Sequence, residues 1–404
     1  DTMRDPVYTY CREVVPPSVV EQAVSLSFTR PRANNLALAR GNLLEIYDVE
    51  LAIKRGGGDD GEVPGDEYMY RDSTTEEFDL PMIRDDTKKH GARDKFEGAK
   101  QPQLRLAGRW SLHGRIVDMQ AVRSGKGQGA ADRLLLSFAE AKMSLIAFDS
   151  STQGIVTESI HYYEHDSLRQ HTFNDAHTCT MRADPERRCI ALRLYGDQLA
   201  ILPLAEPGAA AGADAKPYTD SFVVDMRTDG VSVRNVRDFV FLSGYLEPTL
   251  ALLHEQAPSW AGRVEDSRDT CSVTVVSLDM SRRAVSVLNS ASRLPYDCQA
   301  LLAVPDPLGG VLALATSSIT HIANGTVSCI SVLSHAAARG IGAGMASYLD
   351  RTNVELELSL DPRSSRYVLV GPSTVALWTQ CGHVFLLRLA GTGRLVKRIA
   401  LRQV

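Results

Sequence analysis

Short apolar runs recur along the chain in pairs, and each pair is joined by polar or glycine residues. Six such pairs stand out. They are Leu36–Ala39 with Leu43–Tyr47, Leu134–Phe138 with Met143–Phe148, Ile190–Tyr195 with Leu199–Leu202, Thr249–His254 with Cys271–Leu278, Val311–Ala315 with Ile319–Ile322, and Val375–Thr379 with His383–Leu389. Apolar runs of this length, separated by turn residues, are typical of β-hairpins. The pattern therefore predicts six hairpins and an all-β fold.

The hairpins recur at a regular spacing. They start near residues 36, 134, 190, 249, 311 and 375, so every interval after the first is between 56 and 64 residues long. Weaker strand signals fill the intervals: Ile155–Tyr163, Phe222–Met226, Val236–Phe241 and Val285–Leu288. A repeat of this length with about four strands is typical of the blades of a β-propeller. His335–Leu349 is the main helix candidate, but its glycines favour a loop.

The first interval is longer because it contains a charged segment, Lys54–Gln103. This segment holds 13 acidic and 9 basic residues, and it supplies −4 of the chain's net charge of −5. We interpret residues 54–103 as a disordered insertion within one blade. Lengthening a loop to this extent costs only about 2 kcal/mol of closure free energy, which a propeller tolerates. The remaining sequence predicts a single propeller domain over residues 1–404.

Composition excludes several classes of protein. The chain has 404 residues, of which 44% are apolar, and a slightly acidic balance that argues against a nucleic-acid-binding protein acting alone. It lacks an apolar run long enough to span a membrane, and residues 1–20 lack the pattern of a secretory signal. Its seven dispersed cysteines favour reduced thiols in the cytosol or nucleus over a disulfide framework.

Two glycine-rich stretches and a group of histidines are candidate ligand sites. Gly125–Gly129 and Gly340–Gly344 depart from the spacing of phosphate-binding loops, so we interpret both as connections. Four histidines occur close together: His161, His165, His171 and His177. No cysteine pair or HExxH motif accompanies them, so we expect solvated or turn-bonded side chains and no metal site.

Several carboxylates could suggest glycosidase chemistry, which needs a convergent pair. The candidates are Glu140, Asp149, Asp184, Asp197 and Asp279. Each stands at a predicted turn or strand end, where such residues commonly cap the turn through its own backbone. We also find no GxSxG nucleophile motif. The sequence therefore assigns no catalytic, cofactor-binding or metal-binding residue, and it leaves any protein-binding residues unknown.

Two further patterns have structural interpretations beside functional ones. Asn324-Gly325-Thr326 matches a glycosylation sequon, but Asn-Gly is also a strong turn signal, and we interpret it as a turn. A basic tract lies near the end of the chain: Arg388, Arg394, Lys397, Arg398 and Arg402. It could contact phosphate, form a solvated strand face or contact a partner protein, and the sequence leaves these alternatives open.

Four segments, in order, resemble a known family. They are Asp132–Ser144, Phe241–Leu250, Trp260–Val264 followed by Asp269–Ser272, and Leu294–Cys298 followed by Gly309–Val311. Together they resemble the N-terminal region of the large subunit of the cleavage and polyadenylation specificity factor, from about Asn34 to Ile322. Two paralogous families share single segments of this kind, namely the large subunit of the damaged-DNA-binding complex and a splicing-factor subunit.

The resemblance implies more than the spacing does. That family builds three seven-bladed, WD40-like propellers in a much longer chain and has no catalytic role. It is a scaffold in the nuclear complex that recognises the AAUAAA signal in pre-mRNA, where a WD-repeat subunit and a zinc-finger subunit make most of the base contacts. We therefore expect an incomplete seven-bladed propeller that is a fragment of a multi-propeller protein. The expected protein is nuclear and contacts pre-mRNA mainly indirectly. It is expected to have no cofactor, small-molecule substrate or membrane partner.

The sequence leaves alternative functions open. The same fold could be a scaffold for ubiquitin ligation or splicing, as in the paralogues, a propeller glycosidase, or a protein that binds RNA directly. Ring closure is a separate question, because a propeller must cover the edges of its first and last blades. Val7–Cys11 or Leu395–Leu401 could do so within this chain. We favour a ring that is left incomplete.

Overall fold

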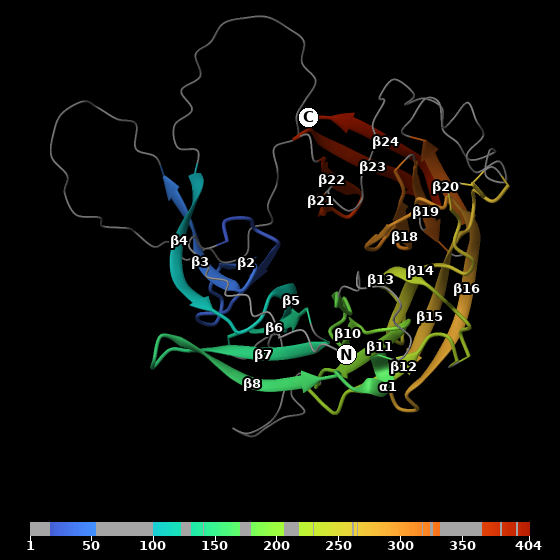
Figure 1. Cartoon of the computed structure of the whole chain (residues 1–404). Coiled ribbons are helices and arrows are strands. Elements are labelled where there is room, and N and C mark those ends of the chain that lie inside the picture. The colour runs from blue at the N-terminus through green and yellow to red at the C-terminus, as the bar shows by residue number, and fades with distance from the viewer. Residues whose placement is uncertain are drawn as a thin grey trace, which may run out of the picture.

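The computed structural model describes most of the chain. The described residues are 17–53, 100–122, 131–139, 141–169, 179–205, 218–228, 230–260, 262–264, 266–316, 318–323, 326–331, 366–379, 382–392 and 395–404. They form six antiparallel sheets of four strands. Each sheet contains four consecutive strands, and these lie side by side across the sheet in sequence order. This arrangement is a β-propeller, and Figure 1 shows the blades following one another along an arc.

The first three blades cover the N-terminal half. Blade 1 contains β1 (Gln22–Leu26), β2 (Asn35–Arg40), β3 (Leu43–Ile53) and β4 (Lys100–Ser111). Blade 2 contains β5 (Ile116–Val122), β6 (Arg133–Phe138), β7 (Lys142–Asp149) and β8 (Gly154–Tyr162). A four-residue helix, α1 (Asp166–Arg169), follows. Blade 3 contains β9 (Met181–Ala183), β10 (Cys189–Arg193), β11 (Gln198–Pro203) and β12 (Phe222–Asp225).

The other three blades continue the same pattern. Blade 4 contains β13 (Val236–Leu242), β14 (Thr249–Glu255), β15 (Cys271–Asp279) and β16 (Ala284–Leu294). Blade 5 contains β17 (Ala300–Ala303), β18 (Val311–Leu314), β19 (Ser318–Ala323) and β20 (Thr326–Ser331). Blade 6 contains β21 (Arg366–Gly371), β22 (Thr374–Trp378), β23 (Val384–Thr392) and β24 (Leu395–Gln403). In the part of the chain that the structure describes, no helix has the length and apolar character needed to cross a membrane.

The six predicted hairpins are confirmed, and each is the middle pair of strands of one blade. These strands are apolar on both faces because a blade is packed between two neighbours. All seven residues of β14, for example, are buried. The expected number of blades is wrong for the described residues, which form six blades where seven were expected. The number seven came from the family resemblance, whereas the residue pattern itself shows six repeats.

Five hydrophobic clusters form the core, and each fills the space between two successive blades. Blades 1 and 2 share the cluster around Phe28, Ile46 and Leu134, and blades 5 and 6 share the one around Leu312 and Leu387. The other three clusters join blades 2 and 3, blades 3 and 4, and blades 4 and 5. Burial of apolar side chains between blades is therefore the main term that holds the ring together.

Blades 1 and 6 do not share such a core. None of the five clusters of described residues contains side chains from both of them. On β21, Tyr367 and Leu369 pack toward blade 5, while Val368 and Val370 on the opposite face are 49% and 45% exposed. Leu395–Leu401 lies within β24, where it completes blade 6 and does not close the ring. Val7–Cys11 lies outside the described residues, as does His335–Leu349.

The boundaries of the charged insertion need one correction. Lys100–Gln103 were assigned to it, but they begin β4 and pair with the end of β3, with Lys100 opposite Ile53. These residues extend a regular antiparallel ladder, which compensates for their low apolar content. The rest of the predicted insertion, residues 54–99, lies outside the described residues.

We expect residues 54–99 to be dispensable for folding. Because Ile53 and Lys100 are directly opposite each other in one ladder, a short Gly/Ser turn can join β3 to β4 without changing their register. The melting temperature, measured by circular dichroism, should change by less than about 3 °C. A fall of more than about 8 °C would show that the segment packs on the propeller, since such a shift exceeds ~2 kcal/mol for a domain of this size.

Candidate functional site

The innermost strands of the blades carry a buried polar network. Two aspartates, Asp118 on β5 and Asp238 on β13, lie at equivalent positions in blades 2 and 4. Each directly follows a register shift in the pairing of its strand, between Ile116 and Asp118 and between Val236 and Asp238. A bulge of this kind redirects a side chain from its usual side of the strand. The two blades therefore use the same local device to position a carboxylate.

Each carboxylate connects its own blade to the next one. Asp118 Oδ1 accepts a hydrogen bond from Met119 N, and Oδ2 accepts one from Met181 N on β9, both at 2.8 Å. Asp238 repeats this pattern, because Oδ1 accepts from Phe239 N and Oδ2 from Leu301 N on β17, again at 2.8 Å. Blade 2 is thus joined to blade 3, and blade 4 to blade 5, by hydrogen bonds from backbone amides to a charged acceptor.

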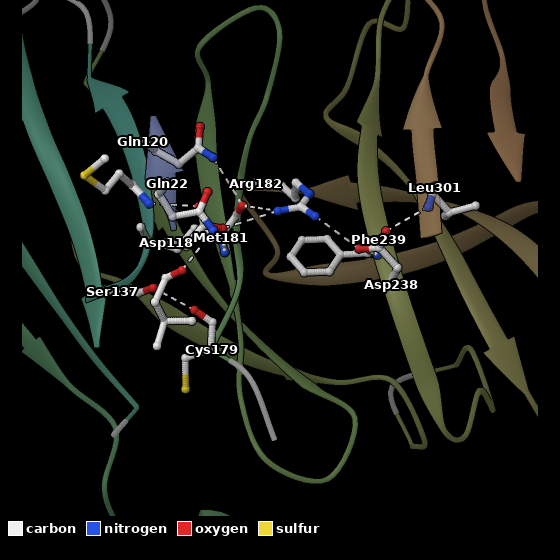
Figure 2. A network of polar contacts seen from close by, with 12 residues as sticks. Gln22, Asp118, Gln120, Ser137, Cys179, Met181, Arg182, Asp238, Phe239 and Leu301 are labelled. Carbon is white, nitrogen blue, oxygen red and sulfur yellow. Dashed lines mark hydrogen bonds and ion pairs between the residues drawn. The ribbon is translucent and has the colours of Figure 1, made fainter. Parts of the chain in front are cut away.

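Arg182 on β9 joins the two connections. Its guanidinium lies 3.3 Å from Asp118 Oδ2 through Nη1 and 3.3 Å from Asp238 Oδ1 through Nη2. Figure 2 shows Arg182 between the two aspartates. One arginine of blade 3 therefore bridges blades 2 and 4. Gln120 adds a bond from its Nε2 to Met181 O at 3.3 Å.

Burial and charge act against each other in this network. Burial raises the pKa of both aspartates, and the positive charge of Arg182 opposes that rise. Burial lowers the pKa of Arg182, but the charges of Asp238 and Asp118 outweigh it and the net shift is upward. Burial, assisted by the charge of Asp238, also raises the pKa of Tyr367 on β21 of blade 6, to about 12.

The geometry of the network favours a structural role. The Asp118 and Asp238 oxygens accept backbone amide hydrogen bonds, which orients each carboxylate toward the protein. A general acid or base must instead reach a substrate with the proton that it exchanges. The network is suited to fixing the angles between successive blades.

The carboxylates singled out in the sequence are spread over three blades: Asp149 lies in blade 2, Asp184 and Asp197 lie in blade 3, and Asp279 lies in blade 4. Asp149 and Asp279 cap their own turns as predicted, with Ser151 N 2.9 Å from Asp149 and Ser281 N 3.0 Å from Asp279. These hydrogen bonds lower the pKa of both carboxyls. Asp184 caps the following turn and also binds the Arg188 guanidinium. Glu140 lies outside the described residues.

Asp197 differs from its predicted role. Its two oxygens accept hydrogen bonds from Asn235 N and Val236 N at 2.8 and 2.7 Å, so it caps the start of blade 4 from blade 3. The prediction was wrong because a turn aspartate in a ring of blades can reach the neighbouring blade as easily as its own backbone.

The structure places some of the other candidates. His161 contacts Ser159 and lies edge-on to Tyr218, and His165 lies edge-on to Tyr162. The described residues do not include His171, His177 or either glycine-rich stretch. Of the sequon, they include only Thr326, which begins β20. Among the residues that are described, no group of three or more His, Cys, Asp or Glu side chains could hold a metal ion. In the basic tract, Arg388 and Arg402 are exposed on β23 and β24, and Arg394 lies outside the described residues.

Comparison with known proteins identifies the family. Residues 96–403 match the family model described as the RSE1/DDB1/CPSF1 first beta-propeller. This match covers more than half of the chain. The chain belongs to this family. The expected resemblance to the large subunit of the cleavage and polyadenylation specificity factor is therefore confirmed.

Individual relatives of this propeller family carry informative names. The chain is 30% identical, over 96% of its length, to the probable cleavage and polyadenylation specificity factor subunit 1 of Oryza sativa. It is 28% identical to the subunit of that name in Arabidopsis thaliana, over 91% of its length, and 28% identical to the protein cft1 of Schizosaccharomyces pombe, over 98%. The chain spans about a quarter of each relative, namely 25%, 24% and 27%.

Reasoning from the sequence missed the inter-blade network of this family member. Its signal was nevertheless present as an aspartate inside a largely apolar strand, in Ile116-Val117-Asp118-Met119 and again in Val236-Arg237-Asp238-Phe239. A buried carboxylate is costly unless it is paired, so such an interruption predicts a specific partner. Arg182 carries no comparable signal, because β9 has only three residues and shows no periodicity.

Proposed function

We propose that this chain is the first propeller of a scaffold subunit in the machinery that cleaves and polyadenylates pre-mRNA. It forms part of a longer, multi-propeller protein and acts in the nucleus. Its role is to hold other subunits, and these include the WD-repeat and zinc-finger proteins that recognise the AAUAAA signal. It performs no chemical step and contacts pre-mRNA mainly through those subunits.

One observation carries this proposal. Two relatives named as subunit 1 of the cleavage and polyadenylation specificity factor match the chain over 96% and 91% of its residues, and the protein cft1 matches it over 98%. The rice relative is 30% identical over 405 aligned residues. The family model itself also includes RSE1 and DDB1, so a scaffold of another complex is a second candidate. The names of the individual relatives favour 3′-end processing.

The architecture supports a binding role over an enzymatic one. Most of the chain forms blades whose polar network links successive inner strands, and the loops that join the strands form two broad faces. Such faces suit the docking of other proteins. A fold of this kind hosts many functions, so the argument rests on the relatives and not on the fold alone.

Depletion of the protein in its source organism tests the proposal. Loss of a 3′-end processing scaffold should produce transcripts that extend past their normal polyadenylation sites, visible by sequencing RNA 3′ ends. Affinity purification under native conditions should recover the WD-repeat and zinc-finger subunits in stoichiometric amounts. Normal 3′ ends together with recovery of splicing or ubiquitin-ligase subunits would favour the second candidate.

The isolated chain should bind AAUAAA RNA only weakly. The expected dissociation constant of a fluorescent AAUAAA oligonucleotide at physiological salt is above 1 μM in order of magnitude, as is typical of non-specific contacts. The reason is the net charge of −5, which gives the chain no net attraction for the phosphate backbone. A scrambled oligonucleotide is the control and should bind equally. Submicromolar, sequence-dependent binding in fluorescence anisotropy would contradict the expectation.

A further inference from the structure

A cleft with a volume of about 490 Å³ lies between blades 1 and 2, and we call it the blade 1–2 cleft. This volume is within the range of sites that bind small ligands or the side chains of a peptide. Blade 1 lines the cleft with Arg30, Asp48, Arg105 and Leu106, and blade 2 lines it with Phe148 and Gln153. The polar network of the inner strands includes none of these residues.

A β-bulge directs Arg105 into the blade 1–2 cleft. The register shift in the pairing of β3 with β4 leaves Ala107 as an extra residue of β4. A bulge of this kind changes the face of the strand on which the residues beyond it lie. Arg109 therefore pairs with Glu45 on one face of blade 1, whereas Arg105 pairs with Asp48 on the face toward blade 2. The same local device positions the two aspartates of the inner strands.

The polar wall of the cleft is supported from the core. Asp48 Oδ1 accepts a hydrogen bond from Asn35 Nδ2 at 2.7 Å, and Asp48 Oδ2 accepts one from Arg105 Nη2 at 3.0 Å. Asn35 is fully buried, and its Oδ1 accepts hydrogen bonds from Phe28 N and Thr29 N at 2.9 and 3.0 Å. A chain of hydrogen bonds thus runs from buried backbone to the guanidinium and holds it in one orientation.

The guanidinium of Arg105 retains donors that face solvent. Its Nε lies 3.3 Å from Glu50 and its Nη2 binds Asp48, but no described residue accepts a hydrogen bond from Nη1, and the side chain is 69% exposed. Other arginines between blades use Nη1 to bind main-chain carbonyls: Arg188 binds Tyr245 O at 3.0 Å, Arg193 binds Arg237 O at 2.9 Å, and Arg237 binds Cys298 O at 2.8 Å. Arg105 Nη1 is suited to the same kind of acceptor.

The opposite wall of the cleft is apolar. The ring of Phe148 is half-buried, and the rings of Phe28 and Trp110 fix it with centroid distances of 6.0 and 6.4 Å. Leu106 is 45% exposed. Gln153, at the rim, has φ = 52°, a backbone conformation that favours glycine. Backbone strain of this kind is found preferentially at binding sites.

The charges around the cleft are nearly balanced. The described segments that line or adjoin it carry three arginines and four carboxylates, namely Arg30, Arg32, Arg105, Asp48, Glu50, Asp132 and Asp149. The carboxylates bind groups of this chain, since Asp149 accepts from Ser151 and Asp132 accepts from Ser27 N. A polyanion such as RNA gains no net attraction here. A neutral polypeptide main chain fits this balance better.

We propose that the blade 1–2 cleft binds an extended polypeptide segment of a partner protein. A main-chain carbonyl of that segment accepts a hydrogen bond from Arg105 Nη1, and a neighbouring main-chain N–H donates to Gln153 Oε1. A large apolar side chain of the segment packs against Phe148 and Leu106. Because Arg105 and Phe148 are already fixed, binding costs the cleft little conformational freedom. This inference goes beyond the proposed function and holds whichever complex contains the chain.

Selection from a phage-displayed library of random dodecapeptides tests the proposal. The library is passed over the 404-residue chain, which is immobilised at low density so that copies do not associate. Enriched peptides are synthesised, and their dissociation constants are measured by surface plasmon resonance. The enriched peptides should share one large apolar residue. A hydrogen bond from a charged donor corresponds to about a ten- to hundredfold change in affinity.

Two substitutions in the cleft and one control separate the outcomes. Arg105→Gln and Gln153→Gly should each weaken peptide binding at least tenfold. Both should keep the melting temperature of the unsubstituted chain, because Arg105 is exposed and glycine relieves the strain at position 153. Arg282→Gln is the matched control: Arg282 is 84% exposed and pairs with Asp279 in blade 4, so peptide binding should be unchanged.

Each other result overturns the inference and leaves the proposed function standing. One such result is a library that yields no enriched peptide, and another is peptides that bind Arg105→Gln as tightly as the unsubstituted chain. Binding of an oligouridine that is lost in Arg105→Gln would assign the cleft to RNA. If peptides bind only after deletion of residues 54–99, the occupant is a segment of this chain and not of a partner.

Discussion

Replacing Arg182 with methionine should lower the free energy of unfolding by about 3–5 kcal/mol at pH 7, because it removes the cation that contacts both buried carboxylates. Asp118 and Asp238 have side chains that are 7% and 11% exposed, and Arg182 is the cation that contacts both. Methionine retains most of the apolar stem and removes the charge. The loss can be measured by urea denaturation followed by tryptophan fluorescence.

The pH dependence of this variant gives a second readout. Burial raises the folded-state pKa of both aspartates, so the folded chain binds their protons more tightly than the unfolded chain does. For such groups, stability is greatest below the unfolded-state pKa of 3.8 and is lost as the pH rises through the folded-state pKa. Removal of Arg182 raises the folded-state pKa of Asp118 and of Asp238 further, because the charge of Arg182 lowers both. The Arg182→Met variant should therefore recover part of its lost stability between neutral and mildly acidic pH.

A matched substitution on the surface controls for loss of an arginine as such. Arg282 is 84% exposed and lies 3.8 Å from Asp279, so Arg282→Met should cost at most about 0.5 kcal/mol. If the two variants unfold at the same urea concentration, or if Arg182→Met loses stability evenly at every pH, the network does not contribute as described.

The hairpins could be predicted because their signal is local. The middle strands of a blade are buried on both faces, so runs such as Leu134–Phe138 are buried throughout, mostly apolar, and end at turn residues. The outer strands are harder to predict. β16 is largely exposed and alternates irregularly, and only Val285–Leu288 of its 11 residues was predicted. Partial exposure removes the apolar run that marks a strand.

The candidate sites depended on contacts between distant residues. Arg182 lies 64 residues from Asp118 and 56 from Asp238 in the sequence, so their association follows from the ring and not from any motif. The connection between β13 and β14 shows the same limit, because the hydrogen bond from Arg188 to Tyr245 O forms only where blade 3 lies beside blade 4. Local pattern thus predicts the repeating unit, and the interactions between units need the structure.

Blade 6 presents an unusual face toward the position where a further blade would pack. Val368 on β21 is 49% exposed, and Trp378 on β22, which shares this face, is 41% exposed. Arg366 and Arg388 accompany them on the same face, as the strand pairing requires. On blade 1, Leu36 and Tyr47 are paired on the face away from blade 2. Apolar side chains of inner strands are ordinarily covered by a neighbouring blade.

The isolated 404-residue chain should therefore self-associate at micromolar concentration through these faces. In the longer protein that we propose, other segments would cover the same faces. Val368→Lys should raise the concentration needed for association at least tenfold, because a lysine on this face cannot be buried against a second copy, and tenfold corresponds to about 1.4 kcal/mol. Val156→Lys on β8 is the control: Val156 is also 49% exposed but lies on an outer strand, and its replacement should leave association unchanged. Sedimentation velocity across a range of concentrations measures both variants. Inner strands that lack a neighbouring blade should open locally, so that their amides exchange with solvent. A monodisperse monomer in which the amides of β1 and β21 are strongly protected from hydrogen exchange would therefore show that the ring closes without help.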